Sequence, residues 1–462
     1  MANLCYEDLV IGQDFEVPVI EGRNVKYVNL DNAASTPPLK KVMEKINQFA
    51  EVYSSVHRGN GFKSYISTEV YQQTREIVGN FVGADLNNHS IIFVKNSTEA
   101  INKLANTFFF NDGDMIIASL MEHHSNDLPW RKKVDIRYIN VTDSGELDLD
   151  HLTYLTEKYK EKIKLVAVTG ASNVTGYINP IHEISKITHS TGAKLLVDAS
   201  QLAPHRQIDI SKVSEQIDFI AFTAHKLYAP FGTGVLIGPK EFFNSVDPDH
   251  VGGGTVKVVT QNEVYWDETP ERNEAGTPNV FGAVALASSI NFIQNLGFDE
   301  IEKHENKLTQ YLFDGLSDIN DIKIYGHTEA DVNKRLGVVS FNLKNMHHSI
   351  VAAILSYEYG IGVRNGCFCA HPYVLKLLNI NSDEFENYKS KIINNDKSNV
   401  PGLVRISLGL YNTIQDIDRL VFALKNITQG KYHKDYVFDS KCGGYIPANW
   451  RDKHKYKFNL RS

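Results

Sequence analysis

The sequence predicts an α/β fold, a large domain with a mostly parallel sheet and a smaller α+β domain, and two observations support it. Between about residues 91 and 238, short apolar runs alternate with longer helical segments, which is typical of parallel strands joined by helices. From about residue 281 the chain changes to longer helices and a few short strands. The 462 residues, 42% of them hydrophobic, suffice for two globular domains.

The expected elements follow from these patterns. The small domain should end with a helix that opens at Thr413, with Asp416 as its capping partner. We divide the chain into an N-terminal segment of the small domain (1–27), a large domain (28–280), a C-terminal small domain (281–429) and a tail (430–462). The expected strands are residues 91–94, 115–119, 136–141, 165–169, 194–197, 219–222 and 235–237, then 322–325, 337–343 and 404–408.

Charge and composition exclude several classes of protein. The net charge of -7 and the scattered basic residues argue against nucleic acid as a partner. No apolar run reaches the length of a membrane helix, and the first residues lack the pattern of a secretory signal, so we expect a cytoplasmic protein without a membrane partner. Four cysteines (Cys5, Cys367, Cys369, Cys442) do not make a disulfide framework, and in that compartment they should be thiols.

Lys226 follows the expected strand at 219–222 and is the most informative residue of the chain. An amine at a strand end beside a cleft is what imine chemistry with an aldehyde cofactor requires, whereas a surface lysine would simply be solvated.

Other polar residues also follow expected strands. Asn96 can cap a helix so that the amides of Ser97 and Thr98 bind a phosphate, although an ordinary capped helix explains it equally well. His123 suits stacking on a flat ring better than sharing a metal with its neighbour His124, and a satisfied polar histidine is the plain alternative.

Asp198 ends an apolar strand, where a carboxylate needs a partner. A protonated pyridine nitrogen is one such partner; helix capping and metal ligation are the alternatives. Asn173 could donate to a phenolate oxygen on the same ring. Because the carboxyl ends of parallel strands face one crevice, these residues and Lys226 together predict a pyridoxal phosphate site. No phosphate-loop or dinucleotide glycine motif is present.

Several ordered motifs carry a resemblance to a known family. The chain resembles the class V aminotransferases, and within them the second group of the cysteine desulfurase and selenocysteine lyase family, with the fold type I architecture of pyridoxal phosphate enzymes. The resemblance spans about residues 28 to 429. Its motifs are LDNAAS (30–35), VHRG (56–59), EHHSN (122–126), VDASQ (197–201), HKLY (225–228), EAGTPN (274–279), RNG (364–366), CA (369–370) and RISL (405–408).

The resemblance implies a role for individual residues. Lys226 would hold the cofactor covalently, His123 would stack on its ring, and Asp198 would pair with its ring nitrogen. Arg405 would bind the substrate carboxylate, and Cys369 would accept sulfur from cysteine as a persulfide, leaving alanine. The remaining implied contacts are Gln201 and Asn173 to the ring oxygen, Ser97, Thr98, Thr223 and His225 to the phosphate, Thr277 to the phosphate of a neighbouring subunit in a homodimer, and Arg364, His57 and Asn173 to the substrate.

Two departures from the family pattern leave the reaction open. Cys367 could relay sulfur to Cys369, form a local disulfide, or bind metal with His371, a poor ligand set, so we expect no metal site. Arg364 and His371 could favour the thiolate of Cys369. The polar insertion at residues 379–400 is a lid or a solvated surface segment, and we favour a lid.

A cysteine desulfurase with a sulfur-acceptor protein as partner is the main functional hypothesis. The alternatives with the same cofactor are a selenocysteine lyase, a carbon-sulfur or carbon-nitrogen lyase, and an aminotransferase. A sulfur carrier or metal-binding protein without catalysis is the third possibility. Cys442, in the tail, could also accept sulfur or be an incidental thiol.

Overall fold

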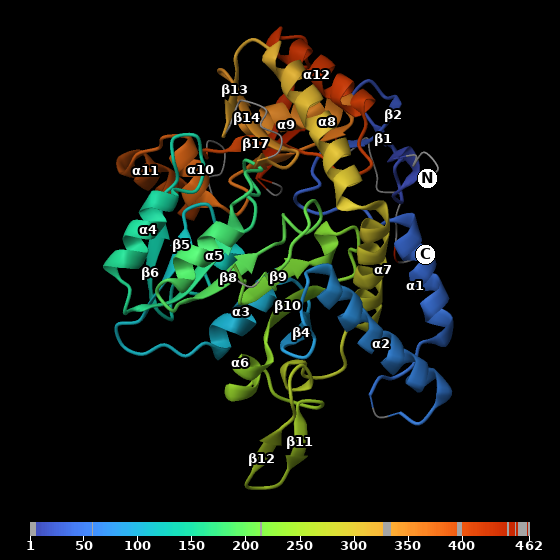
Figure 1. Ribbon diagram of the computed structural model, residues 1–462. Helices are drawn as coiled ribbons and strands as arrows, with labels where there is room; N and C mark the ends of the chain where they lie inside the picture. Colours follow the sequence, from blue (N-terminus) through green and yellow to red (C-terminus); the bar gives the residue numbers. More distant parts are fainter. Residues whose placement is uncertain are drawn as a thin grey trace.

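The computed structural model describes residues 6–57, 59–212, 215–326, 334–394, 400–440, 443–448, 450 and 460. Its centre is a seven-stranded sheet in the order β4-β10-β9-β8-β7-β5-β6 (Figure 1). Only β10 runs against the others, since it pairs antiparallel with β4 and β9 while the remaining neighbours are parallel. The predicted α/β fold is confirmed. The strands are β4 His89–Val94, β5 Met115–Ser119, β6 Asp135–Ile139, β7 Ile163–Thr169, β8 Lys194–Asp198, β9 Phe219–Thr223 and β10 Gly234–Pro239.

Helices cover both faces of this sheet, because successive strand residues point to opposite sides and both sides are apolar. Ile92 and Leu196 pack against α3 and α6 on one face. Phe93 and Val197 belong to the larger core on the other face, with α1, α2, α4, α5 and α7. The helices are α1 Lys40–Val52, α2 Phe62–Phe81, α3 Ser97–Thr107, α4 Leu149–Lys158, α5 Ile181–His189, α6 Lys240–Ser245 and α7 Val280–Leu296.

The second sheet is antiparallel and has the order β13-β14-β17-β16. Helices α8, α9 and α12 pack against it around Phe341 and Ile406. The predicted cap of the last helix is present, since Thr413 and Asp416 form a reciprocal capping box. The elements are β13 Ile322–Tyr325, β14 Val338–Leu343, β16 Arg364–Gly366, β17 Leu403–Ser407, α8 Phe298–Ser317, α9 His348–Tyr359, α10 His371–Leu377, α11 Ser382–Ile393 and α12 Ile414–Thr428.

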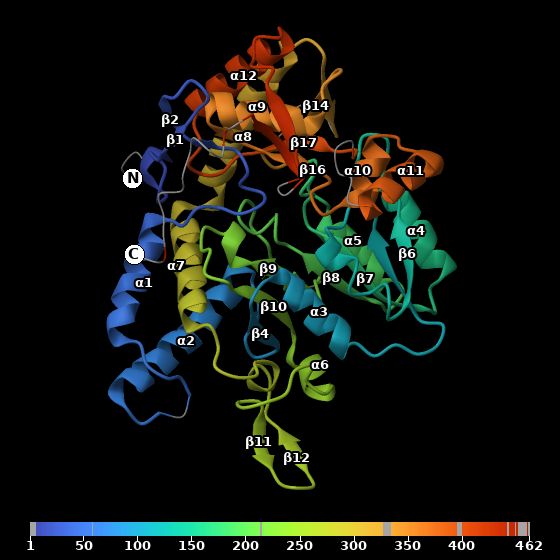
Figure 2. The same cartoon turned by 180° about the vertical axis from the view of Figure 1, so that it is seen from behind.

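The start of the chain joins this smaller unit, because β3 (Val28–Asn29) pairs in parallel with β15 (Ile361–Gly362). Short hairpins complete the described structure, and the one formed by β11 and β12 projects from the body of the protein in both views (Figure 1, Figure 2). The hairpin strands are β1 Glu16–Pro18, β2 Asn24–Lys26, β11 Val256–Val259, β12 Val264–Trp266, β18 Tyr436–Asp439 and β19 Gly444–Pro447.

The sequence patterns missed some of these elements. The hairpins were not predicted, and the polar insertion contains the exposed helix α11. The domain boundaries at residues 27, 280 and 429 stay predictions. Within the described ranges, no single helix has the length and apolar content of a membrane span; α7 and α8 meet that test only as a pair, which is bent by 81°. Cys5, Arg58 and Cys442 lie outside the described residues.

Candidate active site

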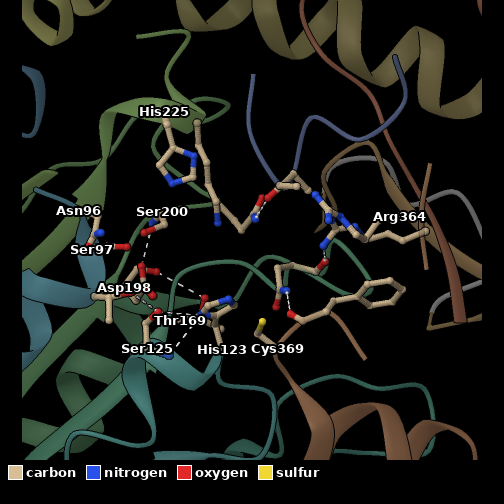
Figure 3. A pocket seen from close by; sticks show the side chains of 18 residues that line it. Asn96, Ser97, His123, Ser125, Thr169, Asp198, Ser200, His225, Arg364 and Cys369 are labelled. Carbon is tan, nitrogen blue, oxygen red and sulfur yellow. Dashed lines mark hydrogen bonds between the residues drawn. The ribbon is translucent and has the colours of Figure 1, made fainter. Parts of the chain in front are cut away.

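A cavity of about 320 Å³ lies where the parallel strands of the large sheet end, and residues of both sheets line it (Figure 3). This volume is in the range of small-molecule sites. Most residues predicted for the site line this one cavity: Ser97, Thr98, His123, Asn173, Asp198, Gln201, His225, Lys226, Arg364, Cys369 and Arg405.

The sheet topology explains this convergence. β4 leads into α3 with Ser97, β8 ends at Asp198, and β9 leads into the short helix η3 (Ala224–Lys226). These strands run in the same direction, so their carboxyl ends meet at one edge. Figure 3 shows Ser97, Asp198, His225 and Cys369 around the same space.

The start of α3 forms an anion-binding site. Asn96 Oδ1 accepts a hydrogen bond from the Glu99 amide at 2.9 Å, which confirms the predicted cap. Glu99 reaches back to the Lys95 amide rather than to Asn96. A Cβ on Gly234 of β10 would lie 2.5 Å from the carbonyl carbon of Asn96, so a side chain there would displace this turn. The first-turn amides of α3 remain free to face an anion.

Two buried hydroxyls beside this turn have no partner. Ser200 Oγ and Thr223 Oγ1 are both shielded from solvent and make no hydrogen bond in the structure. Buried hydroxyls are normally paired, so these two indicate a polar ligand. Ser200 lines the cavity and was not predicted from the sequence; the signal available was its place two residues after the end of β8.

Lys226 has the environment of a reactive amine. Burial lowers its pKa to about 8; Asp198 and Cys369 act in the opposite direction, and Arg405 adds to the lowering. No hydrogen bond to its Nζ is formed by any residue in the described part of the chain. Asp198 is itself buried, with Oδ1 accepting from the Ser200 amide at 3.0 Å. About a tenth of Lys226 is therefore uncharged at pH 7, far more than for a solvated lysine.

His123 is held as a neutral ring. Its Nδ1 accepts from the Ser125 amide at 3.2 Å and lies 2.8 Å from Ser125 Oγ, which in turn lies 2.7 Å from Thr98 Oγ1. Burial, the nearby Lys226 charge, His124 and Arg405 lower the pKa of His123 to about 3. A neutral imidazole with a fixed orientation suits stacking on a flat ring. Ser125, missed in the sequence, is the residue that fixes it.

Arg405 on β17 is oriented from three sides. Its Nη1 donates to the Asn173 carbonyl at 2.9 Å and its Nη2 to Asp31 Oδ1 at 3.1 Å, and its guanidinium lies over the Phe368 ring at 4.9 Å. Arg364 pairs with the other Asp31 oxygen at 2.8 Å. Arg405 Nε is buried without a partner, so the clamp retains donor capacity for a carboxylate. The orienting roles of Asp31 and Phe368 were missed, since both contacts join distant parts of the chain.

Two predicted ring contacts are engaged elsewhere in this structure. Asn173 Nδ2 donates to the Phe368 carbonyl at 2.8 Å. Gln201 Nε2 donates to the Ala33 carbonyl at 2.7 Å. Both side chains still line the cavity, and their predicted roles stay predictions.

Cys369 lies on the loop between β16 and α10, is exposed and lines the cavity. Cys367 differs sharply: its Sγ donates to the Pro401 carbonyl at 3.3 Å, and burial raises its pKa to about 11. Both thiols are free, so no disulfide joins them. Within the described ranges no cluster of histidine, cysteine or acidic residues could hold a metal ion. Since thiols react as thiolates, Cys367 is a poor sulfur relay.

Replacing Cys367 should therefore leave the chemistry intact. We expect Cys367→Ser to retain sulfide release from cysteine within about two-fold, because a hydroxyl can also donate to the Pro401 carbonyl, and to lower the free energy of unfolding by at most about 1.5 kcal/mol. Sulfide assays and urea unfolding would measure the two effects. A large loss of sulfide release in a stably folded variant would instead indicate that Cys367 relays sulfur to Cys369.

The structure bears on three further expectations, which concern His371, the polar insertion, and the positions of Thr277 and His57. Burial lowers the pKa of His371, so it is neutral and does not favour a Cys369 thiolate by its charge. The lid preferred for the insertion stays a prediction: α11 buries none of its side chains and does not line the cavity, and residues 395–399 lie outside the described part. Thr277 and His57 line a second cavity, of about 410 Å³, together with Arg75.

Comparison with known proteins decides the family. The sequence model of the family aminotransferase class-V matches residues 28–420. The chain belongs to this family. Among curated class-V relatives, a probable cysteine desulfurase of Halalkalibacterium halodurans is 35% identical over 420 residues, covering 89% of this chain and 95% of that protein. A cysteine desulfurase of Dickeya dadantii is 35% identical over 419 residues, covering 88% and 93%.

Solved structures agree with this family assignment. The apo structure of a cysteine desulfurase from Thermococcus onnurineus NA1 matches with a TM-score of 0.77 and 34% identity, covering 87% of this chain and 95% of that one. The cysteine desulfurase CsdA from Escherichia coli matches with a TM-score of 0.73 and 28% identity, covering 88% and 96%. The fold is thus that of the class-V enzymes, and the chain is an enzyme of this family.

Proposed function

We propose that this chain is a cysteine desulfurase that uses pyridoxal 5'-phosphate. The observation that carries the proposal is the placement of Lys226, an amine with a pKa lowered to about 8, in the same cavity as the exposed thiol of Cys369. A class-V enzyme that only transaminates has no need of that thiol. The cysteine desulfurases among its relatives support the same activity.

The residues present fit this cofactor. The first turn of α3 and the unpartnered hydroxyls of Ser200 and Thr223 suit a phosphate group. Asp198, buried and without a basic side chain bonded to it among the described residues, suits a protonated ring nitrogen. His123 supplies a flat neutral ring, and Lys226 supplies the amine for the aldehyde.

Arg405 and Lys226 have separate roles in the reaction. Arg405, fixed by Asp31 and Asn173, binds the carboxylate of the substrate. When bound, the cofactor withdraws electrons from the bonds around the α carbon. Lys226, once freed, is basic enough to accept the α proton and to return a proton later.

Cys369 performs the step that defines the reaction. Its thiolate attacks the sulfur of the substrate; a sulfur-sulfur bond forms, the carbon-sulfur bond breaks, and the electron pair left on carbon is protonated to give alanine. The persulfide on the exposed Cys369 is then within reach of an acceptor thiol or a sulfur-acceptor protein.

Product identification tests the proposal directly. The purified holoenzyme is incubated separately with cysteine, with selenocysteine, and with an amino donor plus an oxoacid, and the products are identified by mass spectrometry. We expect alanine and, with reductant, sulfide in equal amounts from cysteine. Selenocysteine turnover alone would favour a selenocysteine lyase, and formation of a new amino acid from the oxoacid an aminotransferase.

We further propose that two copies share their active sites, with Thr277 reaching the phosphate of its partner. Thr277 does not line the cavity of its own chain but a second cavity beside His57, which an approaching subunit would have to cover. Thr277→Asp should abolish activity because it adds a negative charge at a phosphate. Lys226→Ala should also be inactive.

Mixing these two inactive variants provides the sharp test. Random reassembly gives half mixed dimers, each with one intact site, so sulfide release should return to about a quarter of the wild-type rate. The two variants measured separately are the controls. If sulfide release does not recover although subunits have been shown to exchange, Thr277 acts in the active site of its own chain, and the proposal of shared active sites is wrong.

A further inference from the structure

The loop that carries Cys369 has an unfavourable backbone conformation. Phe368 and Cys369 have φ values of 51° and 54°, so two consecutive residues other than glycine lie in the left-handed region. Such a conformation persists only where the surroundings hold it. The loop is therefore an element that can relax when its contacts are removed.

One segment of the large domain makes several of those contacts. The His124 amide, at the start of η2 (His124–Asn126), donates to the Cys369 carbonyl at 2.7 Å. The ring of His124 meets the ring of His371, two residues after Cys369, with 3.0 Å between His124 Nε2 and His371 Nδ1. The two rings are stacked, with centroids 4.9 Å apart and an angle of 7° between their planes.

The hydrogen bond from the His371 amide favours one arrangement of the protons in this pair. The His371 amide donates to His124 Nε2 at 3.5 Å, so that nitrogen carries a lone pair and also accepts from His371 Nδ1. Protonation of His124 at Nε2 removes this lone pair and breaks the bond from the His371 amide, while the Nε2 proton can still be donated to Nδ1 of a neutral His371. Protonation of His371 leaves its Nδ1 a donor, but a second proton on the pair places two positive charges in stacked rings.

Some charged groups around the pair favour the protonation of His124, and others oppose it. Asp127, from the turn after η2, favours protonation of His124, while Arg131 and His371 oppose it. Asp127 is already occupied by Arg131 at 2.6 Å, which weakens its effect on His124. His123 lies alongside, with its ring 6.3 Å from that of His124 and itself neutral.

We propose that the His124–His371 pair is a proton-sensitive latch that holds the Cys369 loop against the large domain, and that protonation of the pair releases the loop. The latch rests on the proposed function only in that Cys369 is the sulfur-accepting thiol. In the released loop Cys369 is no longer held at the cavity, so low pH uncouples the thiol from the substrate site.

The direction of the pH dependence follows from burial. Partial burial is the largest cause that lowers the pKa of both His124 and His371 in the latched loop, and it acts mainly at His124 because His371 keeps an exposed side chain. In a released, solvated loop their pKa values return to about 6.5. The latched state is thus fully favoured above about pH 6.5, loses stability as the pH falls below that value, and reaches its minimum once the pH is below the lowered values.

Hydrogen-deuterium exchange of the holoenzyme tests this without relying on activity. Peptides covering residues 366–375 are followed at about pH 8 and about pH 5, after correction for intrinsic exchange rates. We expect wild-type protection to fall on the order of ten-fold at the lower pH, because the latched loop takes up protons less readily than the released loop. His371→Gln, whose amide can donate to neutral His124 or accept from its protonated form, should keep the loop protected at both values.

Two further variants complete the design. His371→Phe keeps a stacking ring without a donor and should show weak protection at both pH values. His151→Gln, which replaces a histidine that instead accepts from the Asn140 amide, should behave like wild type. Equal wild-type protection at both pH values, or an unchanged pH response in His371→Gln, would overturn the latch. Sulfide assays on the same samples report separately on the desulfurase function.

Discussion

Lys226→Ala is expected to eliminate covalent attachment of the cofactor and to reduce turnover by about 10²–10⁴-fold or more. The side chain supplies both the amine for the aldehyde and the base for the α proton, and proton transfer alone has an effect of this size. Its pKa, lowered to about 8 by burial, is the property that a replacement cannot supply. Reduction with borohydride followed by peptide mass spectrometry would show whether the cofactor is linked to residue 226.

A lysine at the other end of the same sheet gives the matched control. Lys194 begins β8 and pairs with Asp218 at 2.8 Å, away from the cavity. Lys194→Ala should keep covalent cofactor and turnover. If Lys226→Ala still binds the cofactor covalently through another lysine and turns over cysteine, the assignment of the central amine is wrong.

Cys369→Ala is expected to lose sulfide release on the order of 10³-fold or more while the cofactor remains bound. The variant removes the nucleophile and leaves Lys226, Asp198 and Arg405 in place, so substrate binding should survive. Cysteine should therefore still change the visible absorbance of the holoenzyme. Persulfide on residue 369 should be detectable by mass spectrometry after reaction with cysteine in wild type and absent in the variant.

The comparison with Cys367 sharpens this test. The two cysteines are two residues apart, yet one is exposed at the cavity and the other is half-buried and donates to the Pro401 carbonyl. Loss of activity should follow residue 369 alone. Undiminished sulfide release by Cys369→Ala with a reductant other than a thiol would contradict the proposed nucleophile.

Local sequence patterns were sufficient where the cause is local. Each predicted strand overlaps an observed one, because short apolar runs that alternate with longer helical segments are typical of a buried, mostly parallel sheet. The caps at Asn96 and Thr413 were equally predictable, since the bonds join residues three apart. The exposed helix α11 was not, because its polar composition is also that of a loop.

The sequence by itself determined the α/β architecture, the strand-end positions of Asp198 and Lys226, and the family to which its motifs belong. Tertiary structure alone decided which side chains orient Arg405 and which contact the loop that carries Cys369. Asp31 meets Arg405 across 374 positions of the chain, and His371 meets His124 across 247. Such pairs depend on how the two sheets and their loops pack together, and no local pattern records that packing. The difference between Cys367 and Cys369 has the same origin, since burial rather than residue type makes one thiol inert and leaves the other exposed.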